Sequence, residues 1–226
     1  HPVSAGTEGR MGSELDMRLF ERLAECPDID YLNIHIWPLN WSWIHRESVE
    51  EDLPAAIRET DRYIDEHAAL ARRLRKKIVI EEFGYPRDGF EFRKGSPTSA
   101  RDAYYSHIFE RLTESAEKGG ELLGCNFWGW GGLAAQNPDH IWWEPGDDYC
   151  GDPSQEEQGL NSVYMADSST IALIREANAK LAATVCLEFP EPESWLMCGT
   201  DRRSVKVDFF CAEDCTVKAG AAFVSD

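Results

Sequence analysis

The stretch Ile78-Val-Ile-Glu-Glu-Phe-Gly84 decides the fold class of this chain. Its run of β-branched residues indicates a strand buried on both faces, as in a parallel sheet, and Glu81 and Glu82 stand at its end. Because side chains alternate along a strand, we expect the two glutamates to face opposite sides of the sheet, so that only one can enter a site. Taken alone, an acidic pair at a strand end is more often simply solvated.

Strands and helices alternate on both sides of this stretch. Apolar periodicity predicts further strands at residues 31–36 and 122–128, and helices at 13–24 (capped by Ser13), 51–74, 98–117 and 168–182. The alternation predicts an α/β fold in which helices cover a parallel sheet. Polar and aromatic residues gather just after each strand, which is where α/β folds build their sites. A closed barrel needs eight such units, and this chain has only three or four.

The charge of the chain excludes some kinds of partner. Its 226 residues include 23 Lys and Arg against 41 Asp and Glu, a formal net charge of −18. Nucleic acids and anionic membranes both require a basic face, so we expect neither as a partner. No stretch approaches the roughly 18 consecutive apolar residues that a membrane span requires.

The pattern changes after about residue 184. Residues 185–189 and 205–210 have the pattern of short strands, and no helical periodicity lies between them. We therefore predict one unit at residues 1–183 and, at 184–226, the start of a small β-sandwich-like domain that is too short to bury its own core. The segment holds Cys186, Cys198, Cys211 and Cys215, so one or two disulfides can form there in an oxidising compartment.

Tryptophan is the most informative part of the composition. There are 8 in the chain, most of them in the clusters Trp37/Trp41/Trp43, Trp128/Trp130 and Trp142/Trp143. Sugar-binding clefts use aromatic faces as stacking platforms, although large aromatic rings also fill cores. A strand that delivers a carboxylate into a tryptophan-lined mouth is what a glycosidase needs, since one carboxylate attacks the anomeric carbon while a second acid protonates the leaving oxygen.

Metal and cofactor signals are weak. The pair Asp147/Asp148 could suggest calcium, which prefers oxygen ligands, but the spacing is not that of an EF-hand loop. The cysteines lack zinc-ligand spacing. We therefore predict no metal and no cofactor.

The motifs around the central strand resemble those of glycoside hydrolase family 5, and more narrowly of its β-mannanase branch. They are His35-Ile-Trp-Pro38, Ile80-Glu-Glu-Phe-Gly-Tyr-Pro-Arg-Asp88 and Gly124-Cys-Asn-Phe-Trp-Gly-Trp-Gly-Gly132, which are similar to strands six, seven and eight of that family. Gly6-Thr-Glu-Gly9 resembles the end of strand five, and residues 147–164 resemble the segment that closes such barrels. Over about residues 1–182, the resemblance implies the C-terminal half of a (β/α)8 TIM barrel, strands five to eight, with strands one to four expected before His1.

The same resemblance implies the catalytic residue and its neighbours. Glu82 maps to the nucleophile, and Glu81 would then point into the sheet–helix layer or pair with a neighbouring base. His35 maps to a histidine near the nucleophile, although without the resemblance a core histidine is the better interpretation. Trp37 stands where the family usually has Tyr, and its indole N–H can donate a hydrogen bond but can neither accept one nor ionise.

Further residues are expected to bind sugar. The resemblance makes Trp128 the platform beneath the sugar at the cleavage point. Trp130 lies on the same strand face by the period of two, so it extends that floor or simply packs. Glu8 maps to a position that hydrogen-bonds sugar hydroxyls beyond the cleaved bond.

The acid/base of the family is the Glu of an Asn-Glu-Pro motif on strand four, and no Asn-Glu-Pro occurs here. We expect this residue before His1, and we expect residues 1–226 alone not to hydrolyse mannan. The sequence thus predicts part of a retaining, endo-acting β-mannanase that is secreted or periplasmic and monomeric when complete. Open alternatives are a β-1,4-glucanase of the same family, a carbohydrate-binding protein without catalysis, and a structural α/β domain whose aromatic clusters are core.

Overall fold

The computed structural model describes residues 1–184, 186–187 and 217–218. The chain forms two compact units, His1–Ala177 and Asn178–Asp226. In chain order, the elements are α1 (Met17–Ala24), β1 (Tyr31–Ile36), α2 (Leu53–Leu74), β2 (Lys77–Phe83), the 3-10 helix η1 (Asp88–Phe90), α3 (Ser99–Lys118), β3 (Leu122–Phe127), β4 (Trp130–Gly132), β5 (Val163–Tyr164), α4 (Ser168–Thr184), β6 (Cys186–Leu187) and β7 (Val217–Lys218).

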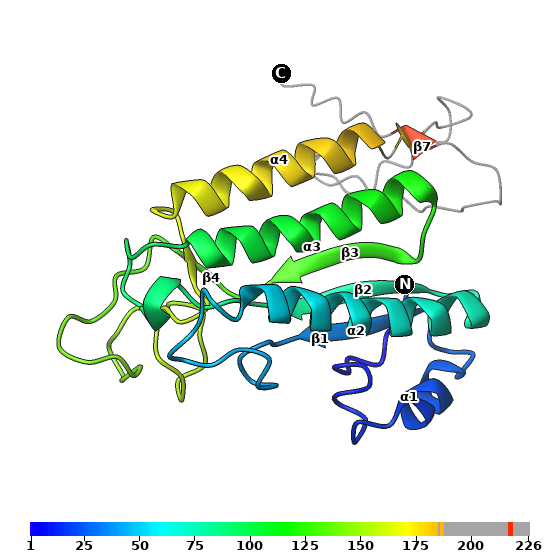
Figure 1. Cartoon of the computed structure of the whole chain (residues 1–226), viewed down its shortest axis with the longest axis horizontal. Helices are drawn as coiled ribbons and strands as arrows, with labels where there is room; N and C mark the ends of the chain where they lie inside the picture. The colour runs from blue at the N-terminus through cyan, green and yellow to red at the C-terminus, as the bar shows by residue number, and fades with distance from the viewer. Residues whose placement is uncertain (185, 188–216, 219–226) are drawn as a thin grey trace, which may run out of the picture. The chain divides into compact units, whose positions relative to one another are not determined.

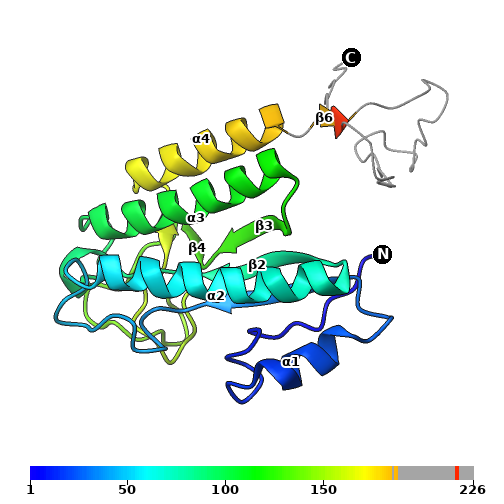
Figure 2. The same ribbon diagram turned by 45° about the vertical axis from the view of Figure 1, so that its right-hand side comes forward.

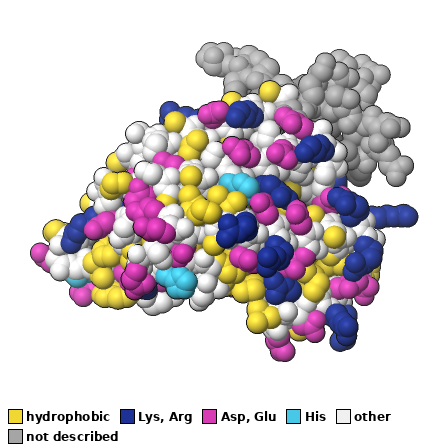
Figure 3. Space-filling model, viewed as in Figure 1, with side chains coloured by type: hydrophobic (Ala, Val, Ile, Leu, Met, Phe, Trp, Pro, Cys, Tyr) yellow, Lys and Arg dark blue, Asp and Glu magenta, His cyan; other side chains and the backbone are white. Residues whose placement is uncertain are grey.

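A parallel sheet of order β1-β2-β3 is the centre of the first unit. Helices α2 and α3 lie side by side along one of its faces (Figures 1 and 2). Between sheet and helices the core is apolar: Ile34, Ile80 and Phe83 are fully buried, and the ring of Phe83 meets that of Tyr105 of α3 edge-on. The predicted parallel sheet covered by helices is confirmed. On the face of the molecule that Figure 3 shows, basic and acidic side chains are interspersed.

The register of β2 carries an irregularity that the sequence did not reveal. Ile34 pairs with Ile80, yet the next residue of β1, His35, pairs with Glu82, so Glu81 is an extra residue in β2. Such a β-bulge re-aims the side chains around it. Since paired residues of adjacent strands face the same side, Glu82 faces the side of His35, opposite to the buried Ile80.

Glu81 is turned to this same side of the sheet. Its carboxylate accepts a hydrogen bond from the hydroxyl of Tyr31, which shares a face of β1 with His35 because strand side chains alternate. The expectation that the two glutamates face opposite sides is therefore wrong. Simple alternation fails because the bulge inserts one residue between Ile80 and Glu82.

The predicted strand 122–128 is also interrupted. Strand β3 ends at Phe127, the Trp128–Gly129 peptide bond is cis, and Trp130 opens β4, which pairs with β5 in a separate two-stranded parallel sheet. The prediction that Trp130 shares a strand face with Trp128 is wrong, because alternation holds only within one continuous strand.

Helix α1 begins later than the sequence suggests. Glu14 and Leu15 have φ values of 55° and 60°, which no right-handed helix contains. The side chain of Asp16 caps the helix by accepting from the backbone N–H of Arg18, whereas the Ser13 hydroxyl donates to the carbonyl of Gly9. The prediction of Ser13 as the cap is therefore wrong.

In the second unit, β6 and β7 form an antiparallel pair. Strand β6 falls within the predicted strand 185–189, while the predicted strand 205–210 and the cysteines Cys198, Cys211 and Cys215 lie outside the described residues. The boundary at residues 183/184 and the β-sandwich-like domain stay predictions. Among the described side chains, the cysteines Cys26, Cys125 and Cys150 are free thiols. None of the described helices has the length and apolar composition to cross a bilayer.

Candidate active site

A carboxylate with an indole donor and an imidazole at the same oxygen lies at the end of β2. Oε2 of Glu82 accepts a hydrogen bond of 3.2 Å from the indole Nε1 of Trp37 and lies 3.1 Å from Nδ1 of His35. The Glu82 side chain is 28% exposed, so a ligand in the surrounding solvent can reach it. Both of these neighbours lie at Oε2 rather than at Oε1. The structure therefore brings the predicted residues Glu82, His35 and Trp37 together.

Close packing fixes the indole of Trp37. A Cβ on Gly84 would lie 2.6 Å from the indole atom Cζ3, so only glycine fits beneath the ring. The Trp128 ring meets Trp37 edge-on at 6.2 Å between centroids, and the backbone N–H of Trp128 donates to the carbonyl of Phe83. The half-buried Trp128 thus belongs to the same cluster as Glu82.

Glu81 has partners of its own. Its Oε1 accepts hydrogen bonds from the Ser4 hydroxyl at 3.0 Å and from the Tyr31 hydroxyl at 3.2 Å. The expectation that it points into the sheet–helix layer or pairs with a base is wrong, because its side chain lies on the face opposite to the buried Ile80 and its partners are hydroxyl groups. Glu81 thereby ties the N-terminal segment to the sheet one residue before Glu82.

The N-terminal segment of residues 3–8 runs beside β1. The buried side chain of Asn33 accepts from the backbone N–H of Gly6 and donates to the carbonyl of Thr7, and the N–H of His35 approaches the carbonyl of Glu8 at 3.5 Å. Glu8 therefore lies at the same end of the sheet as His35, and its side chain is partly exposed.

Helix α2 holds the turn that follows Glu8. The hydroxyl of Tyr63 donates to the Glu8 carbonyl, and Nε2 of the buried His67 accepts from the backbone N–H of Arg10 at 2.9 Å. Burial lowers the pKa of His67 to about 4 and raises that of Tyr63, so both side chains are neutral. A Cβ on Gly9 would lie 2.7 Å from His67 Nε2, which explains the glycine at this contact.

Buried arginines anchor the long loop on the other side of Glu82. Arg87 binds both carboxylate oxygens of Asp167, at 2.9 and 2.6 Å, and both side chains are almost fully buried. Arg101 donates to the carbonyls of Tyr85, Leu160 and Ser162. Sequence reasoning missed these arginines, because several of their acceptors, in residues 160 to 167, lie 59 to 80 residues away, so each arginine looks like any surface charge in the sequence.

The same loop carries an asparagine that the sequence analysis did not single out. The buried Asp152 accepts from the backbone N–H groups of Gly159 and Asn161, at 2.8 and 3.0 Å. The Asn161 side chain comes within 3.0 Å of a Cβ placed on Gly84. Asn161 therefore borders the end of β2, where Glu82 lies.

Other predicted residues lie elsewhere. Trp130 is 54% exposed, and its ring contacts that of Phe127 at 6.5 Å. Trp41 and Trp43 pack against each other and against the buried Tyr63, which fits the core-filling alternative for these two rings.

The aspartates considered for calcium have local partners. Asp147 accepts from the side-chain amide of Asn137, which with the Glu144 N–H lowers its pKa, and Asp148 accepts from the N–H of Ala135. Within the part of the chain that the structure describes, no group of three or more His, Cys, Asp or Glu side chains could hold a metal ion.

A partly exposed carboxylate lies at the end of a parallel strand, with an indole donor and a histidine at one oxygen and a second tryptophan beside them, which is the kind of arrangement that glycosidases of the α/β class use. The family described as GH family 5 beta-mannosidase-like matches residues 1–185. This chain belongs to glycoside hydrolase family 5, and its fold is part of a (β/α)8 barrel.

Relatives and solved structures support this assignment. Mannan endo-1,4-beta-mannosidase 1 of Oryza sativa subsp. japonica is 29% identical over 142 residues, which are 57% of this chain and 31% of that protein. A crystal structure of a glycoside hydrolase family 5 mannosidase from Rhizomucor miehei superposes with a TM-score of 0.71 at 31% identity, covering 81% of this chain and 44% of that one. A mutant of that mannosidase was solved in complex with mannosyl-fructose, again at 31% identity, with a TM-score of 0.70 and the same coverage. The chain spans about a third of the length of the curated relatives it matches.

Proposed function

We propose that this chain is part of a retaining, endo-acting glycoside hydrolase that cleaves β-1,4-mannosidic bonds in mannan, with Glu82 as the nucleophile. The observation that carries the proposal is the placement of Glu82 at the end of β2, where its Oε2 accepts from the Trp37 indole and lies 3.1 Å from Nδ1 of His35. An ionised carboxylate is the form that attacks the anomeric carbon. The mannan substrate is proposed by analogy with these relatives, which are mannan endo-1,4-beta-mannosidases.

The reaction divides into two displacements. In the first, Oε1 of Glu82 bonds to the anomeric carbon, the bond from that carbon to the leaving sugar oxygen breaks, and an acid protonates the oxygen. In the second, water attacks the same carbon while the deprotonated acid accepts its proton, and the Glu82 carboxylate is released. Trp37 and His35 keep Oε2 oriented through both steps. Trp128 is proposed as the surface on which the reacting sugar stacks, and Glu8 as an acceptor for hydroxyls beyond the cleaved bond.

The general acid is proposed to lie outside residues 1–226. By the same argument, β1, β2 and β3 would be strands six, seven and eight of the barrel, with residues 3–8 in the place of strand five. Trp130 is proposed as an outer contact for the polysaccharide, since its ring is exposed. We further propose a secreted or periplasmic monomer that needs no cofactor.

A mechanism-based label tests this proposal in the protein expressed from its whole open reading frame. An activated 2-deoxy-2-fluoro-β-mannoside needs little protonation of its leaving group, so it traps the glycosyl-enzyme. We expect a mass increase of one fluoromannosyl group, located on Glu82 by peptide mapping. Glu82→Gln should abolish labelling and lower mannan turnover by about a thousandfold or more, because an amide does not attack.

Glu81→Gln is the matched control, since it changes the neighbouring carboxylate on the same face of the sheet. It should still be labelled, with an effect on stability because the bonds to Ser4 and Tyr31 weaken. A label on Glu81 would contradict the assignment of the nucleophile. Faster labelling by the fluoroglucoside would favour the glucanase alternative, and binding of mannan without label or turnover would favour the non-catalytic protein.

A further inference from the structure

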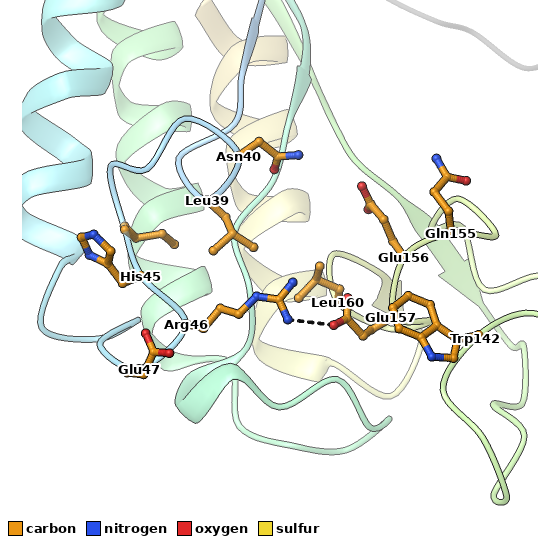
Figure 4. Close-up of a pocket in the computed structure, with 11 residues that line it drawn as sticks. Leu39, Asn40, His45, Arg46, Glu47, Trp142, Gln155, Glu156, Glu157 and Leu160 are labelled. Atoms are coloured by element: carbon orange, nitrogen blue, oxygen red, sulfur yellow. Dashed lines mark hydrogen bonds and ion pairs between the residues drawn. The ribbon is translucent and has the colours of Figure 1, made fainter.

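A hollow of about 440 Å³ opens between the loop that follows β1 and the long loop that precedes β5 (Figure 4). Its volume lies in the range of small-molecule sites. Residues from both loops line it, among them Asn40, Arg46, Trp142, Glu156, Glu157 and Leu160. None of these residues belongs to the catalytic cluster around Glu82.

An ion pair crosses the hollow from one loop to the other. Nη1 of Arg46 binds Oε1 of Glu157 at 2.9 Å, as the dashed line in Figure 4 marks. The Arg46 guanidinium also lies over the Phe90 ring, 4.6 Å from its centroid. The Glu157 side chain is only 9% exposed, so its position is fixed by packing as well as by Arg46. Its bond to Arg46 uses Oε1, and Oε2 can accept a hydrogen bond from a ligand hydroxyl.

An aromatic face completes the chemistry of the hollow. Trp142 is 47% exposed and lines the hollow, so a ligand can cover part of its surface. Its segment is held in place, because the N–H of Gln158 donates to the Ile141 carbonyl at 2.8 Å and Nδ1 of His140 lies 2.6 Å from the Trp142 carbonyl. The ring is therefore presented by a structured backbone and loses little freedom when a ligand covers it.

This combination fits a neutral hexose. An indole face packs against the C–H face of a pyranose ring, while carboxylate, amide and guanidinium groups bind its hydroxyls. The charge of Arg46 is already matched by Glu157, so no unpaired cation in the wall calls for an anionic ligand. A hydrophobic ligand is disfavoured because Asn40, Glu156 and Glu157 would lose their hydration without hydrogen-bond partners.

The hollow adjoins the catalytic cluster along both of its walls. Leu39 and Asn40 follow Trp37 closely in the chain, and the N–H of Trp41 donates back to the Trp37 carbonyl at 3.0 Å. Leu160 directly precedes Asn161, which borders Gly84. An oligosaccharide with one unit at Glu82 can therefore extend another unit toward the hollow.

We propose that the hollow between Arg46, Glu157 and Trp142 is a subsite for a hexose unit of the substrate other than the unit attacked by Glu82. This inference rests on the proposed function. It predicts that the enzyme distinguishes substrates by their length, because only a longer oligosaccharide reaches both places.

The test compares substrates of different length in the whole protein. An aryl β-mannoside reports the chemistry at Glu82, and manno-oligosaccharides from mannobiose to mannohexaose report the extended site. For Trp142→Ala, we expect the loss in kcat/KM to grow with the number of mannose units, to about tenfold for mannohexaose relative to the aryl mannoside, as the removal of one stacking face implies. Arg46→Met should give the same trend by releasing Glu157.

Tyr149→Ala is the matched control, because Tyr149 is a 63% exposed aromatic residue of the same loop that does not line the hollow. It should not change kcat/KM for mannohexaose relative to that for the aryl mannoside. If Trp142→Ala leaves kcat/KM unchanged, or lowers it equally for all substrate lengths, the subsite proposal is overturned. Hydrolysis of the aryl mannoside would still support the proposed function. If the protein cleaves no mannoside, calorimetry with mannohexaose still decides, since unchanged affinity in Trp142→Ala overturns the subsite and weakened affinity supports it.

Discussion

Lowering the pH from 6.5 to about 4 should destabilise the protein through His67. Burial, aided by repulsion from Arg10, lowers the pKa of His67 from 6.5 to about 4. The imidazole is confined between the rings of Phe20 and Tyr63, and its Nε2 must stay unprotonated to accept from the Arg10 N–H. Glu66 lies 3.8 Å from Nδ1, but it is paired with the Arg10 guanidinium and therefore attracts the imidazolium only weakly.

The size of the effect follows from the shift in pKa. Between pH 4 and 6.5 the unfolded state binds more protons at this histidine than the folded state, so stability rises with pH across that window. The contribution of His67 is complete above pH 6.5 and is lost as the pH falls to about 4. A shift from 6.5 to about 4 corresponds to about 3 kcal/mol at most.

Urea unfolding of the wild-type protein and of His67→Gln across this pH range measures the effect. We expect the variant to be less stable at neutral pH, because it loses the fitted imidazole, and to lose about 3 kcal/mol less than the wild type on acidification. The difference between the two curves removes the contribution of every carboxylate that both proteins share. Parallel curves would refute the assignment of a buried neutral His67. Protonation of Nε2 breaks the hydrogen bond from the Arg10 N–H. The first change therefore occurs at the turn that follows Glu8.

Three further substitutions test the surroundings of Glu82. Trp37→Phe removes one donor to Glu82 and should lower kcat/KM about 30-fold, the equivalent of about 2 kcal/mol, with urea unfolding as the check on folding. Gly84→Ala introduces a Cβ 2.6 Å from the Trp37 ring, so we expect about 1–3 kcal/mol lower stability in urea together with lower kcat. Arg87→Met leaves the buried Asp167 carboxylate without its cation and should cost about 3–5 kcal/mol in urea unfolding, whereas adding Asp167→Asn should restore part of that loss.

The sequence predicted the helices and strands that depend on local periodicity. The apolar runs at 31–36 and 78–80 form β1 and the buried part of β2, and the helix predicted at 51–74 begins at Leu53 and ends at Leu74. Within each of these elements, apolar residues recur with the spacing of a strand or a helix, so the element can be recognised in the sequence without knowledge of the fold. The helix predicted at 98–117 is confirmed for the same reason.

What the sequence could not reveal depends on contacts between distant segments. The bulge at Glu81 arises from the register between β1 and β2, which no local pattern encodes. The break after Trp128 depends on Gly129 and on the carbonyl of Gly151, which lies 2.9 Å from a Cβ at that position. The anchoring of the long loop by Arg87 likewise requires Asp167, far along the chain.

The bulge and the tryptophan at position 37 together explain how Glu82 is oriented. Without the extra residue in β2, Glu82 would share the face of Ile80 and lie against the helices, where a carboxylate would be buried without partners. With it, Glu82 faces His35 and receives the indole N–H of Trp37. An indole can only donate, so the hydrogen bond to Oε2 cannot reverse, as one from a phenol could when the carboxyl is protonated. The larger ring requires Gly84 beneath it, so the donor at position 37 and the glycine after the strand form one structural unit that keeps Oε2 of this carboxylate an acceptor and leaves Oε1 for the proposed nucleophilic attack.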